Sequence, residues 1–421
     1  MAKREIISAI DIGTTKIVAL IMQREEDGKF SILGLGKAPS NGVKRGVVVH
    51  IDETVQAITS AREQAEKMAS LRMGEVYVGI AGQHIKSMKN RNQKYIDSEE
   101  ISQEDVDYLN EQISKTPLEP GEEILHVIPQ SYIVDQETDV TRPVGMSGRV
   151  LEANFHLVIG KVTSARNITK CVERAGLTVR KLILEPLASA TAVLTPDERE
   201  AGVAVIDIGG GTTDLAVFYA DVVRHTAVIP FGGNVITNDI KEGCSILLRH
   251  AEALKTQYGS AMGDTAPDDK VVTIPGISGR DPREISFKSL SYIIQARMEE
   301  ILDAIVFEIE NSGYAEKLSA GLVLTGGGAL LRDLPQLVRF KTGYDVRIGY
   351  PGQFLIPETD SAFNQPVFST GIGLVLEGYH DGPTMIRAGQ RPVRNAQINN
   401  GIIEKIHKGW SSFFSDDTNR F

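Results

Sequence analysis

Two glycine-rich segments that lie far apart in the chain carry residue types suited to binding phosphate. Residues 11–16 read Asp-Ile-Gly-Thr-Thr-Lys, and residues 207–214 read Asp-Ile-Gly-Gly-Gly-Thr-Thr-Asp. Consecutive backbone N–H groups in a glycine turn form a concave nest for anionic oxygens. Threonine hydroxyls and a lysine ammonium would add further donors. The candidate phosphate-binding residues are Gly13, Thr14, Thr15, Lys16, Gly209, Gly210, Gly211, Thr212, Thr213 and Asp214.

The aspartate that opens each segment indicates a metal ion as well. Asp11 and Asp207 each come near the end of an apolar run, which places their carboxylates at a strand end. A carboxylate in this position can hold Mg²⁺ through bound water. Two such turns facing each other would clamp a polyphosphate from both sides. The pair therefore predicts a site for a ligand that carries phosphate and Mg²⁺.

The runs that flank the two turns predict the elements that must position them. Residues 6–12 and 17–22 flank the first turn, and residues 203–208 and 214–219 flank the second. Each run has the length of a buried strand, and glycine supplies the positive φ that a tight turn needs. An ordinary hairpin with an acidic turn is the alternative for either copy alone. The duplication favours the phosphate site.

A third glycine segment follows another apolar run. Residues 321–325 predict a strand, and residues 329–331 predict the start of a helix. A strand that leads through glycines into a helix N-terminus can bind an anion or a nucleotide. An ordinary glycine turn is again the alternative, because contiguous glycines differ from the spaced G-x-G-x-x-G pattern. The glycines concerned are Gly326, Gly327 and Gly328.

The order of these three segments resembles the actin-like ATPase superfamily, where they are the first phosphate, second phosphate and adenosine motifs. Residues 184–190 and 368–373 resemble its two connecting helices. Within the superfamily, the chain is similar to the bacterial FtsA cell-division family over about residues 5–380. The segments that carry this closer resemblance are 126–130, 143–148, 225–230 and 345–349.

The resemblance implies a two-lobed α/β fold of the repeated ribonuclease H-like type, with ATP and Mg²⁺ as ligands. It implies that Glu185 could orient a water for attack on the γ-phosphate, with Asp11 and Asp207 as the other candidate catalytic residues. It leaves open whether the protein is an enzyme, and we expect at most slow ATP hydrolysis. Further nucleotide contacts implied by the resemblance are Gly232, Gly233, Lys241 and Glu242.

The same resemblance, with the pattern of apolar runs, predicts how the chain is divided. The first lobe is interrupted by an FtsA-type inserted subdomain, and the second lobe carries an outer subdomain. The expected ranges are 1–83, 163–201 and about 365–380 for the first lobe, 84–162 for the insertion, 202–242 and 314–364 for the core of the second lobe, 243–313 for the outer subdomain, 381–400 for a flexible linker and 401–415 for an amphipathic helix.

Apolar spacing and capping residues predict several further elements. Helices are expected at 52–70 with Asp52 as the N-cap, from Ser102, at 164–175, at 238–258 and at 290–309. Apolar residues of the last of these helices recur at helical spacing and predict a core stripe. Strands are expected at 76–81, 124–134, 155–162 and 271–274.

Composition restricts the kinds of partner that the protein can bind and the cellular compartment that it fits. The formal net charge of −10 argues against a whole-surface affinity for nucleic acid or anionic lipid, so an acidic partner would need a local basic patch. The two cysteines stand in unrelated contexts, which fits a reducing cytoplasm. No signal peptide is expected, because Asp11 interrupts the first apolar run. No apolar stretch of about 18 residues occurs, so membrane contact is expected to be peripheral.

The C-terminal segment has a different character. Residues 381–400 are rich in Gly, Pro, Asn and Arg, which is typical of a flexible linker. From residue 381 to residue 409 there are five Lys or Arg and two Asp or Glu. An amphipathic, locally basic helix with aromatic residues on its apolar face is typical of an in-plane membrane anchor. The candidate lipid-contacting residues are Ile402, Ile403, Ile406, Trp410, Phe413 and Phe414, with Lys405 and Lys408 on the polar face.

The resemblance also implies partners and a location. Members of the FtsA family polymerise, hold filaments of tubulin-like FtsZ to the cytoplasmic face of the inner membrane at the division septum, and recruit later division proteins. The outer subdomain would dock the acidic, apolar C-terminal peptide of FtsZ, to which Arg280 and Arg283 could pair. Solvated arginines are the alternative. No nucleic-acid partner is expected.

Two other functions fit parts of the sequence. A small-molecule kinase on the same fold would need a catalytic base and an acceptor pocket, for which the sequence offers no motif. A non-filament adaptor such as the pilus protein PilM shares the insertion and the nucleotide motifs. Neither is expected to carry the terminal helix.

Changing both Trp410 and Phe414 to Glu should abolish binding to lipid vesicles, because both lie on the face that would enter the lipid. Changing Lys405 and Lys408 to Ala should weaken binding to anionic vesicles alone, by about 1 kcal/mol per lysine. Vesicle flotation measures binding. The emission of Trp410, the single tryptophan of the chain, should shift to the blue when vesicles are added.

A terminal helix that docks on its own globular body is the alternative, and the same variants test it. In that case the Glu pair would lower the melting temperature of the protein, and the wild type would not float with lipid. A tryptophan spectrum that is already blue and does not respond to lipid would contradict the membrane anchor.

Overall fold

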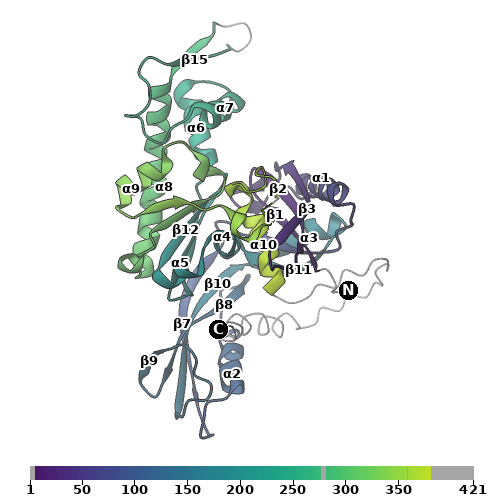
Figure 1. The fold of residues 1–421 in the computed structure, drawn as a ribbon, viewed down its shortest axis with the longest axis vertical. Helices are drawn as coiled ribbons and strands as arrows, with labels where there is room; N and C mark the ends of the chain where they lie inside the picture. Colours follow the sequence, from purple (N-terminus) through teal and green to yellow (C-terminus); the bar gives the residue numbers. More distant parts are fainter. Residues whose placement is uncertain (1–4, 276–280, 358, 381–421) are drawn as a thin grey trace.

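The structure is a computed structural model in which residues 5–275, 281–357 and 359–380 are described. Two five-stranded mixed sheets lie at the centres of two lobes (Figure 1). The first sheet has the order β11-β6-β1-β2-β3, and the second has the order β14-β13-β12-β17-β18. Their strands are β1 (Ile6–Ile12), β2 (Lys16–Arg24), β3 (Phe30–Pro39), β6 (Glu75–Ile80) and β11 (Thr178–Leu184), then β12 (Val203–Ile208), β13 (Thr213–Tyr219), β14 (Val222–Ile229), β17 (Leu322–Thr325) and β18 (Val346–Ile348).

The two sheets repeat one topology. In each, a central strand pairs antiparallel with the next strand along the chain and parallel with a strand on its other side. The predicted strand–turn–strand pattern is therefore confirmed, and it is one part of a duplicated sheet. β1 and β12 have the predicted limits, because their buried apolar runs end at glycine turns.

Helices cover both faces of the first sheet. α1 and α3 pack on its outer face, where Gly34 and Gly36 allow close approach: a Cβ on Gly36 would fall 1.8 Å from the carbonyl oxygen of Ala61. α4 and α10, the two predicted connecting helices, lie between the lobes (Figure 1). They touch where Gly373 meets Ala188, since a Cβ there would fall 1.8 Å from the Ala188 carbonyl oxygen. The helices are α1 (Ile51–Ala69), α3 (Val162–Arg174), α4 (Glu185–Val193) and α10 (Ser369–His380).

The insertion forms a four-stranded sheet with one helix, at the bottom of Figure 1. The predicted capping box is present, because the Ser102 side chain and Asp105 each bond the other's backbone N–H. Three strands of this sheet also contact the second lobe. His156 Nε2 lies 2.9 Å from Thr226 Oγ1, Ser87 Oγ donates to the Thr226 carbonyl at 3.0 Å, and Gln130 Nε2 donates to the Val223 carbonyl at 2.5 Å. The elements are β7 (Lys86–Tyr95), α2 (Gln103–Ile113), β8 (Glu122–Val134), β9 (Glu137–Val140) and β10 (Val150–Lys161).

The outer subdomain stands at the top of Figure 1 on the long helix α8. The predicted apolar stripe of α8 is confirmed as core: Leu290, Ile294, Ile301, Leu302, Ile305 and Ile309 are buried, and Ile293 packs against them. Helix α6 (Gly233–Cys244) leads into the outer subdomain, whose elements are α7 (Leu248–Tyr258), β15 (Val271–Ile274), β16 (Arg283–Ser286) and α8 (Phe287–Ser312). Helices α5 (Pro196–Ala201) and α9 (Leu334–Thr342) contact the second sheet. Short pieces complete the fold: β4 (Val43–Lys44), β5 (Val47–Val48), and the 3-10 turns Ala315–Lys317, Gly327–Leu330, Pro351–Phe354 and Pro366–Phe368.

Two helix predictions outside the glycine segments are wrong. The helix predicted at 238–258 is two helices, because Ser245 adopts a left-handed conformation with φ of 52° and ends α6. Asp52 is not the N-cap of α1. His50 takes that position, and Asp52 lies in the first turn, where it accepts a hydrogen bond from Arg174 at 2.7 Å. A carboxylate in the first turn still favours the helix through the macrodipole.

None of the helices described here is long and apolar enough to cross a membrane. Cys171 is buried and Cys244 is partly exposed, and both are free thiols. The predicted linker and terminal helix lie outside the described residues.

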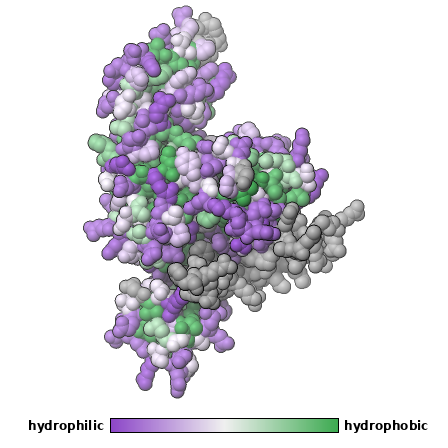
Figure 2. Space-filling view, in the orientation of Figure 1, coloured by the Kyte–Doolittle hydropathy of each residue, from purple (hydrophilic) through white to green (hydrophobic). Residues whose placement is uncertain are grey.

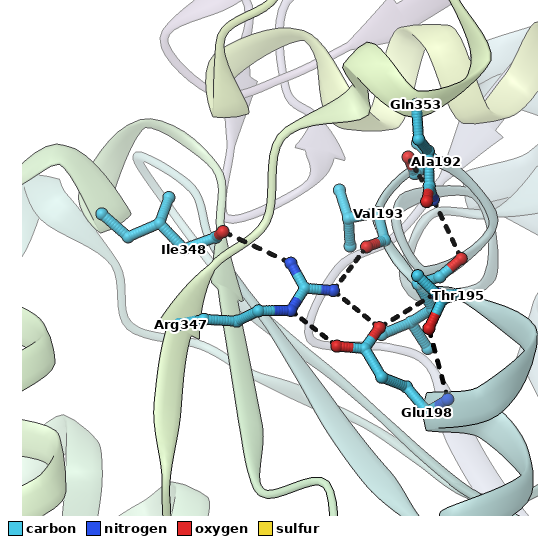
Figure 3. Close-up of polar contacts among 8 residues, drawn as sticks. Ala192, Val193, Thr195, Glu198, Arg347, Ile348 and Gln353 are labelled. Carbon is cyan, nitrogen blue, oxygen red and sulfur yellow. Dashed lines mark hydrogen bonds and ion pairs between the residues drawn. The ribbon is translucent and has the colours of Figure 1, made fainter.

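An arginine fastens the end of α4 to the second sheet (Figure 3). Arg347, on β18, forms a fork with Glu198, with Nε–Oε1 and Nη2–Oε2 distances of 2.6 Å, and Nη2 also donates to the Val193 carbonyl at 2.8 Å. Glu198 in turn accepts from the Thr195 backbone N–H at 2.9 Å. Burial alone would raise the pKa of Glu198, but these hydrogen bonds outweigh it and lower that pKa.

Arg347→Ala should lower the free energy of unfolding by about 2 kcal/mol, because it leaves a charged acceptor and a carbonyl without their donor. Arg347→Lys should cost less, since it keeps the charge and loses the fork. The pKa of Glu198 is lower in the folded state than its ordinary value of 4.5. Its ion pair therefore contributes its full share to the free energy of unfolding above pH 4.5, and this share is lost as the pH falls through the folded-state pKa. Urea unfolding should therefore show the variants converging with the wild type in acid. A difference independent of pH would contradict the ion pair as its cause.

Candidate functional site

The structure places the two predicted glycine turns against each other. A Cβ on Gly210 would fall 2.2 Å from Thr15 Cγ2, and a Cβ on Gly211 would fall 2.4 Å from Thr14 Oγ1. Thr14 Oγ1 also accepts from the backbone N–H of Gly46 at 3.2 Å, which ties the first turn to the β4–β5 hairpin. Glycine is therefore required in the second turn so that the two turns can meet.

The second turn is held by the start of α6. The backbone N–H groups of Gly233 and Asn234 donate to the carbonyls of Gly209 and Gly210, at 2.9 and 2.8 Å. A Cβ on Gly232 would fall 2.6 Å from the Gly209 carbonyl oxygen, so this position also requires close backbone approach. Gly232 and Gly233, which only the family resemblance had implicated, thus lie at the second turn.

Asp207 lies below the turns, where both connecting helices contribute a hydroxyl. Its Oδ2 accepts from Ser189 Oγ of α4 at 2.6 Å and from Thr370 Oγ1 of α10 at 3.0 Å. Lys16, from the first hairpin, donates to the Val367 carbonyl at 2.5 Å, just before α10. Ser189 and Thr370 were not predicted as site residues, although both lie within the segments predicted as the connecting helices.

Four carboxyl groups share this region with one lysine, and their titration reflects it. Burial raises the pKa of Asp11 to about 6, with Lys16 lowering it and Asp207 raising it. Burial is likewise the main cause that raises the pKa of Asp207, Asp214 and Glu185, and the neighbouring carboxylates add to it for Asp214 and Glu185. Burial lowers the pKa of Lys16. The four carboxyl groups therefore outnumber the one positively charged side chain beside them, and a bound cation would stabilise their ionised forms.

The residues present fit Mg²⁺ held through water and phosphate. Within the described ranges, no group of three His, Cys, Asp or Glu side chains could hold a metal ion directly. Mg²⁺ commonly keeps several waters and uses one or two carboxylates together with ligand phosphates. Asp11 and Asp207 supply such carboxylates, and Oδ1 of Asp214 is buried without a hydrogen-bond partner among the described groups.

Glu185 occupies the first turn of α4, where Gly79 makes room for it. A Cβ on Gly79 would fall 2.9 Å from Cγ and Oε1 of Glu185. Burial raises the pKa of Glu185, and the negative charges of three nearby carboxylates raise it further: Asp11, Asp214 and Asp207. Glu185 therefore belongs to the same group of carboxylates.

The third glycine segment also meets Asp207, but its predicted helix is wrong. Gly326 has a φ of 80°, and a Cβ there would fall 2.2 Å from Asp207 Oδ1. Residues 327–330 form a 3-10 turn, not an α-helix, and α9 begins at Leu334. The N-cap Asp333 is left-handed and Pro335 stands in the first turn of α9, so the α-helix starts there. Gly328 packs against Ile208, from which a Cβ would lie 2.3 Å.

The other predicted residues lie farther along the second lobe or outside the description. Lys241 and Glu242 occupy the last turn of α6, where Lys241 Nζ lies 2.6 Å from Glu242 Oε1. At a rise of 1.5 Å per residue, Lys241 lies about 12 Å along the helix from Gly233. Arg283 begins β16 and donates to the Cys244 carbonyl at 3.1 Å. Arg280 and the candidate lipid-contacting residues lie outside the described residues.

Comparison with known proteins identifies the family. The sequence model described as "Cell division protein FtsA" matches residues 204–373, and the one described as "SHS2 domain inserted in FTSA" matches residues 82–159. Cell division protein FtsA of Neisseria meningitidis serogroup B is 42% identical over 370 residues, which cover 88% of this chain and 89% of the relative. The protein of the same name from Escherichia coli K12 is 38% identical over 382 residues, covering 89% and 90%.

Solved structures with the same fold are more distant in sequence. The PilM–PilN type IV pilus biogenesis complex gives a TM-score of 0.63 at 16% identity, covering 88% of this chain and 98% of that one. MreB5 of Spiroplasma citri bound to ADP gives 0.53 at 15% identity, covering 87% and 94%. These likenesses concern the fold alone, which is actin-like. The relatives above, by contrast, share sequence over most of their length, and the chain therefore belongs to the FtsA family of cell-division proteins.

Proposed function

We propose that the chain binds Mg-ATP between its two glycine turns and serves as an ATP-dependent switch and scaffold in cell division. The observation that carries this proposal is the meeting of the turns above Asp11 and Asp207, two buried carboxylates with raised pKa values. Asp11 and Asp207 would hold Mg²⁺, and the ion would supply positive charge that stabilises the phosphates. The actin-like neighbours support it, since MreB5 of Spiroplasma citri has been solved bound to ADP and bound to AMPPNP.

The side chains of the site would divide the work. Lys16 and the threonine hydroxyls would bind phosphate oxygens, and the backbone of the second turn would hold the other side. Ser189 and Thr370 fix the orientation of Asp207. Glu185 would orient an attacking water, and burial, together with the carboxylates of Asp11, Asp214 and Asp207, raises its pKa.

Family membership supports the wider role. In this proposal the chain polymerises, docks FtsZ through residues 243–313, and holds it to the cytoplasmic face of the inner membrane through residues 401–415. Several tails on one filament would bind lipid far more firmly than one, because each later contact is intramolecular. Later division proteins would then assemble on the same filament at the septum.

The outer subdomain offers a surface suited to an acidic peptide with apolar residues. Large apolar side chains are exposed on three of its elements: Leu248 is 51% exposed, Val271 52% and Tyr292 44%. Figure 2 shows apolar residues among hydrophilic ones on this subdomain, at the top of the view. Arg283 is exposed as well and begins β16, which pairs with β15. Exposed apolar side chains and an exposed arginine on one subdomain match the chemistry of the FtsZ C-terminal peptide.

Asp207→Asn should weaken Mg-ATP binding at least tenfold, because it removes a carboxylate from the metal position. The nucleotide-free variant should melt at a slightly higher temperature than the wild type, since the folded state disfavours the ionised form that Asn replaces. Calorimetric titration and thermal unfolding measure the two effects. Asp97→Asn, at an exposed position in the insertion, is the matched control and should change neither.

Gly210→Val is a second probe of the same site. It should also reduce binding, because its side chain would meet Thr15 and separate the turns as well as occupy space near the phosphates. If both variants bind ATP as tightly as the wild type, the nucleotide lies elsewhere.

Changing Arg280 and Arg283 to Glu together should weaken binding of a synthetic FtsZ C-terminal peptide about tenfold or more and leave ATP binding intact. Affinity for the wild type should fall as salt rises, because the contact is partly ionic. Fluorescence titration of labelled peptide measures both. Arg166→Glu, an exposed charge reversal on α3, controls for net charge. Peptide affinity unchanged by the double substitution would move the docking site off this surface.

A further inference from the structure

Helix α6 connects the second glycine turn to the outer subdomain. At its first turn, the N–H groups of Gly233 and Asn234 donate to the carbonyls of Gly209 and Gly210. At its last turn, the Cys244 carbonyl accepts from Arg283 at 3.1 Å. A helix of 12 residues is about 18 Å long. One rigid element therefore contacts both the candidate phosphate site and the arginine proposed to meet the partner.

A lysine of the outer subdomain clamps the first turn of this helix. Lys255, on α7, donates to the Gly233 carbonyl at 2.9 Å and to Thr237 Oγ1 at 2.7 Å, and pairs with Glu252 at 2.7 Å. Its side chain is 13% exposed. Three acceptors thus take up the three donors of the ammonium group. A lysine with all its donors used and little exposure holds its neighbours in a defined position.

The absence of a side chain at Gly233 lets the ammonium group approach the second turn. A Cβ on Gly233 would fall 3.2 Å from Lys255 Nζ and 3.7 Å from the Gly209 carbonyl oxygen. The ammonium group of Lys255 therefore lies beside Gly233, whose N–H donates to the Gly209 carbonyl of the second turn. It fixes the packing of α6 against that turn.

A second contact makes α6 move together with the outer subdomain. Arg297, on α8, binds Asp239 of α6 through Nε at 2.5 Å and Nη2 at 3.1 Å. Ile236 and Ile240 of α6 are buried in the same core as α8. A displacement of α7 and α8 would consequently displace the first turn of α6 and the second glycine turn with it.

We propose that Lys255 is a positioning residue for nucleotide binding, and that α6 couples nucleotide binding at the glycine turns to peptide binding at the outer subdomain. This inference rests on the proposed function. A phosphate seated in the second turn selects one position of α6, and a peptide that engages Arg283 acts on the other end of the same helix. Coupling of this kind is reciprocal: each ligand changes the affinity for the other by the same factor.

Lys255→Met tests the inference, because it removes the three donors and keeps the apolar stem. Mg-ATP affinity should fall about tenfold in a calorimetric titration. The affinity of the FtsZ C-terminal peptide is then measured with and without Mg-ATP. In the wild type the two values should differ several-fold, and in the variant their ratio should approach one, with the nucleotide-free value unchanged. A purely structural role would lower the melting temperature and leave this ratio as it is.

Two companion variants keep the test decisive. Thr237→Val removes one acceptor of Lys255 and should shift the ratio in the same direction by a smaller factor, which serves if Lys255→Met is poorly folded. Lys170→Met, at an exposed position of α3, should change nothing. If the wild type binds no ATP, the proposed function fails. If the wild type binds ATP and Lys255→Met shows the same ATP affinity and the same peptide ratio, the inference alone is overturned.

Discussion

The meeting of two glycine turns above a group of buried carboxylates is the constraint on which the rest of the structure depends. Side chains on Gly210 or Gly211 would collide with the threonines of the first hairpin and separate the lobes at this point. Asp11 and Asp207 are largely buried, because each lies on a strand at the centre of its sheet. Each carboxylate must be stabilised where it stands, by Lys16, by hydroxyls of the connecting helices or by a bound cation. The duplicated sheets supply the turns, and α4 and α10 supply the hydroxyls.

Local sequence was sufficient to predict the two hairpins. It was insufficient to predict the side chains that bind Asp207 beneath them. The strands at 6–12 and 203–208 could be predicted because a buried strand and its glycine turn are both local features. Ser189 and Thr370 could not be recognised, since a hydroxyl on an otherwise apolar helix has no local signal of its function. Their convergence on Asp207 depends on the contact of α4 with α10, which is a tertiary feature.

The ends of helices were also predicted incorrectly from the sequence. Apolar residues continue at helical spacing across Ser245, so periodicity alone joined α6 to α7. In the structure, residues 245–247 separate the two helices, beginning with the left-handed Ser245. The same kind of error placed a helix at 329, where a 3-10 turn precedes α9. Lys255 had no local signal either, because its partners on α6 come from an earlier part of the chain. The domain limits, the lipid-contacting residues and Arg280 remain predictions from sequence.

The carboxylate group also explains how one site could govern two distant attachments. Raised pKa values mean that the ionised carboxylates cost the folded protein free energy in the absence of a cation, and Mg²⁺ with nucleotide would offset that cost. Such a ligand stabilises the arrangement of every element that touches the group. α10 begins beside Asp207 and ends at His380, where the predicted linker to the membrane helix starts. α6 begins at the second turn and ends at the contact with Arg283. On the proposed function, α10 leads from these carboxylates toward the lipid-binding segment, and α6 leads from them toward the FtsZ-binding subdomain. Nucleotide binding would therefore act on both binding regions, although the two regions need not contact each other.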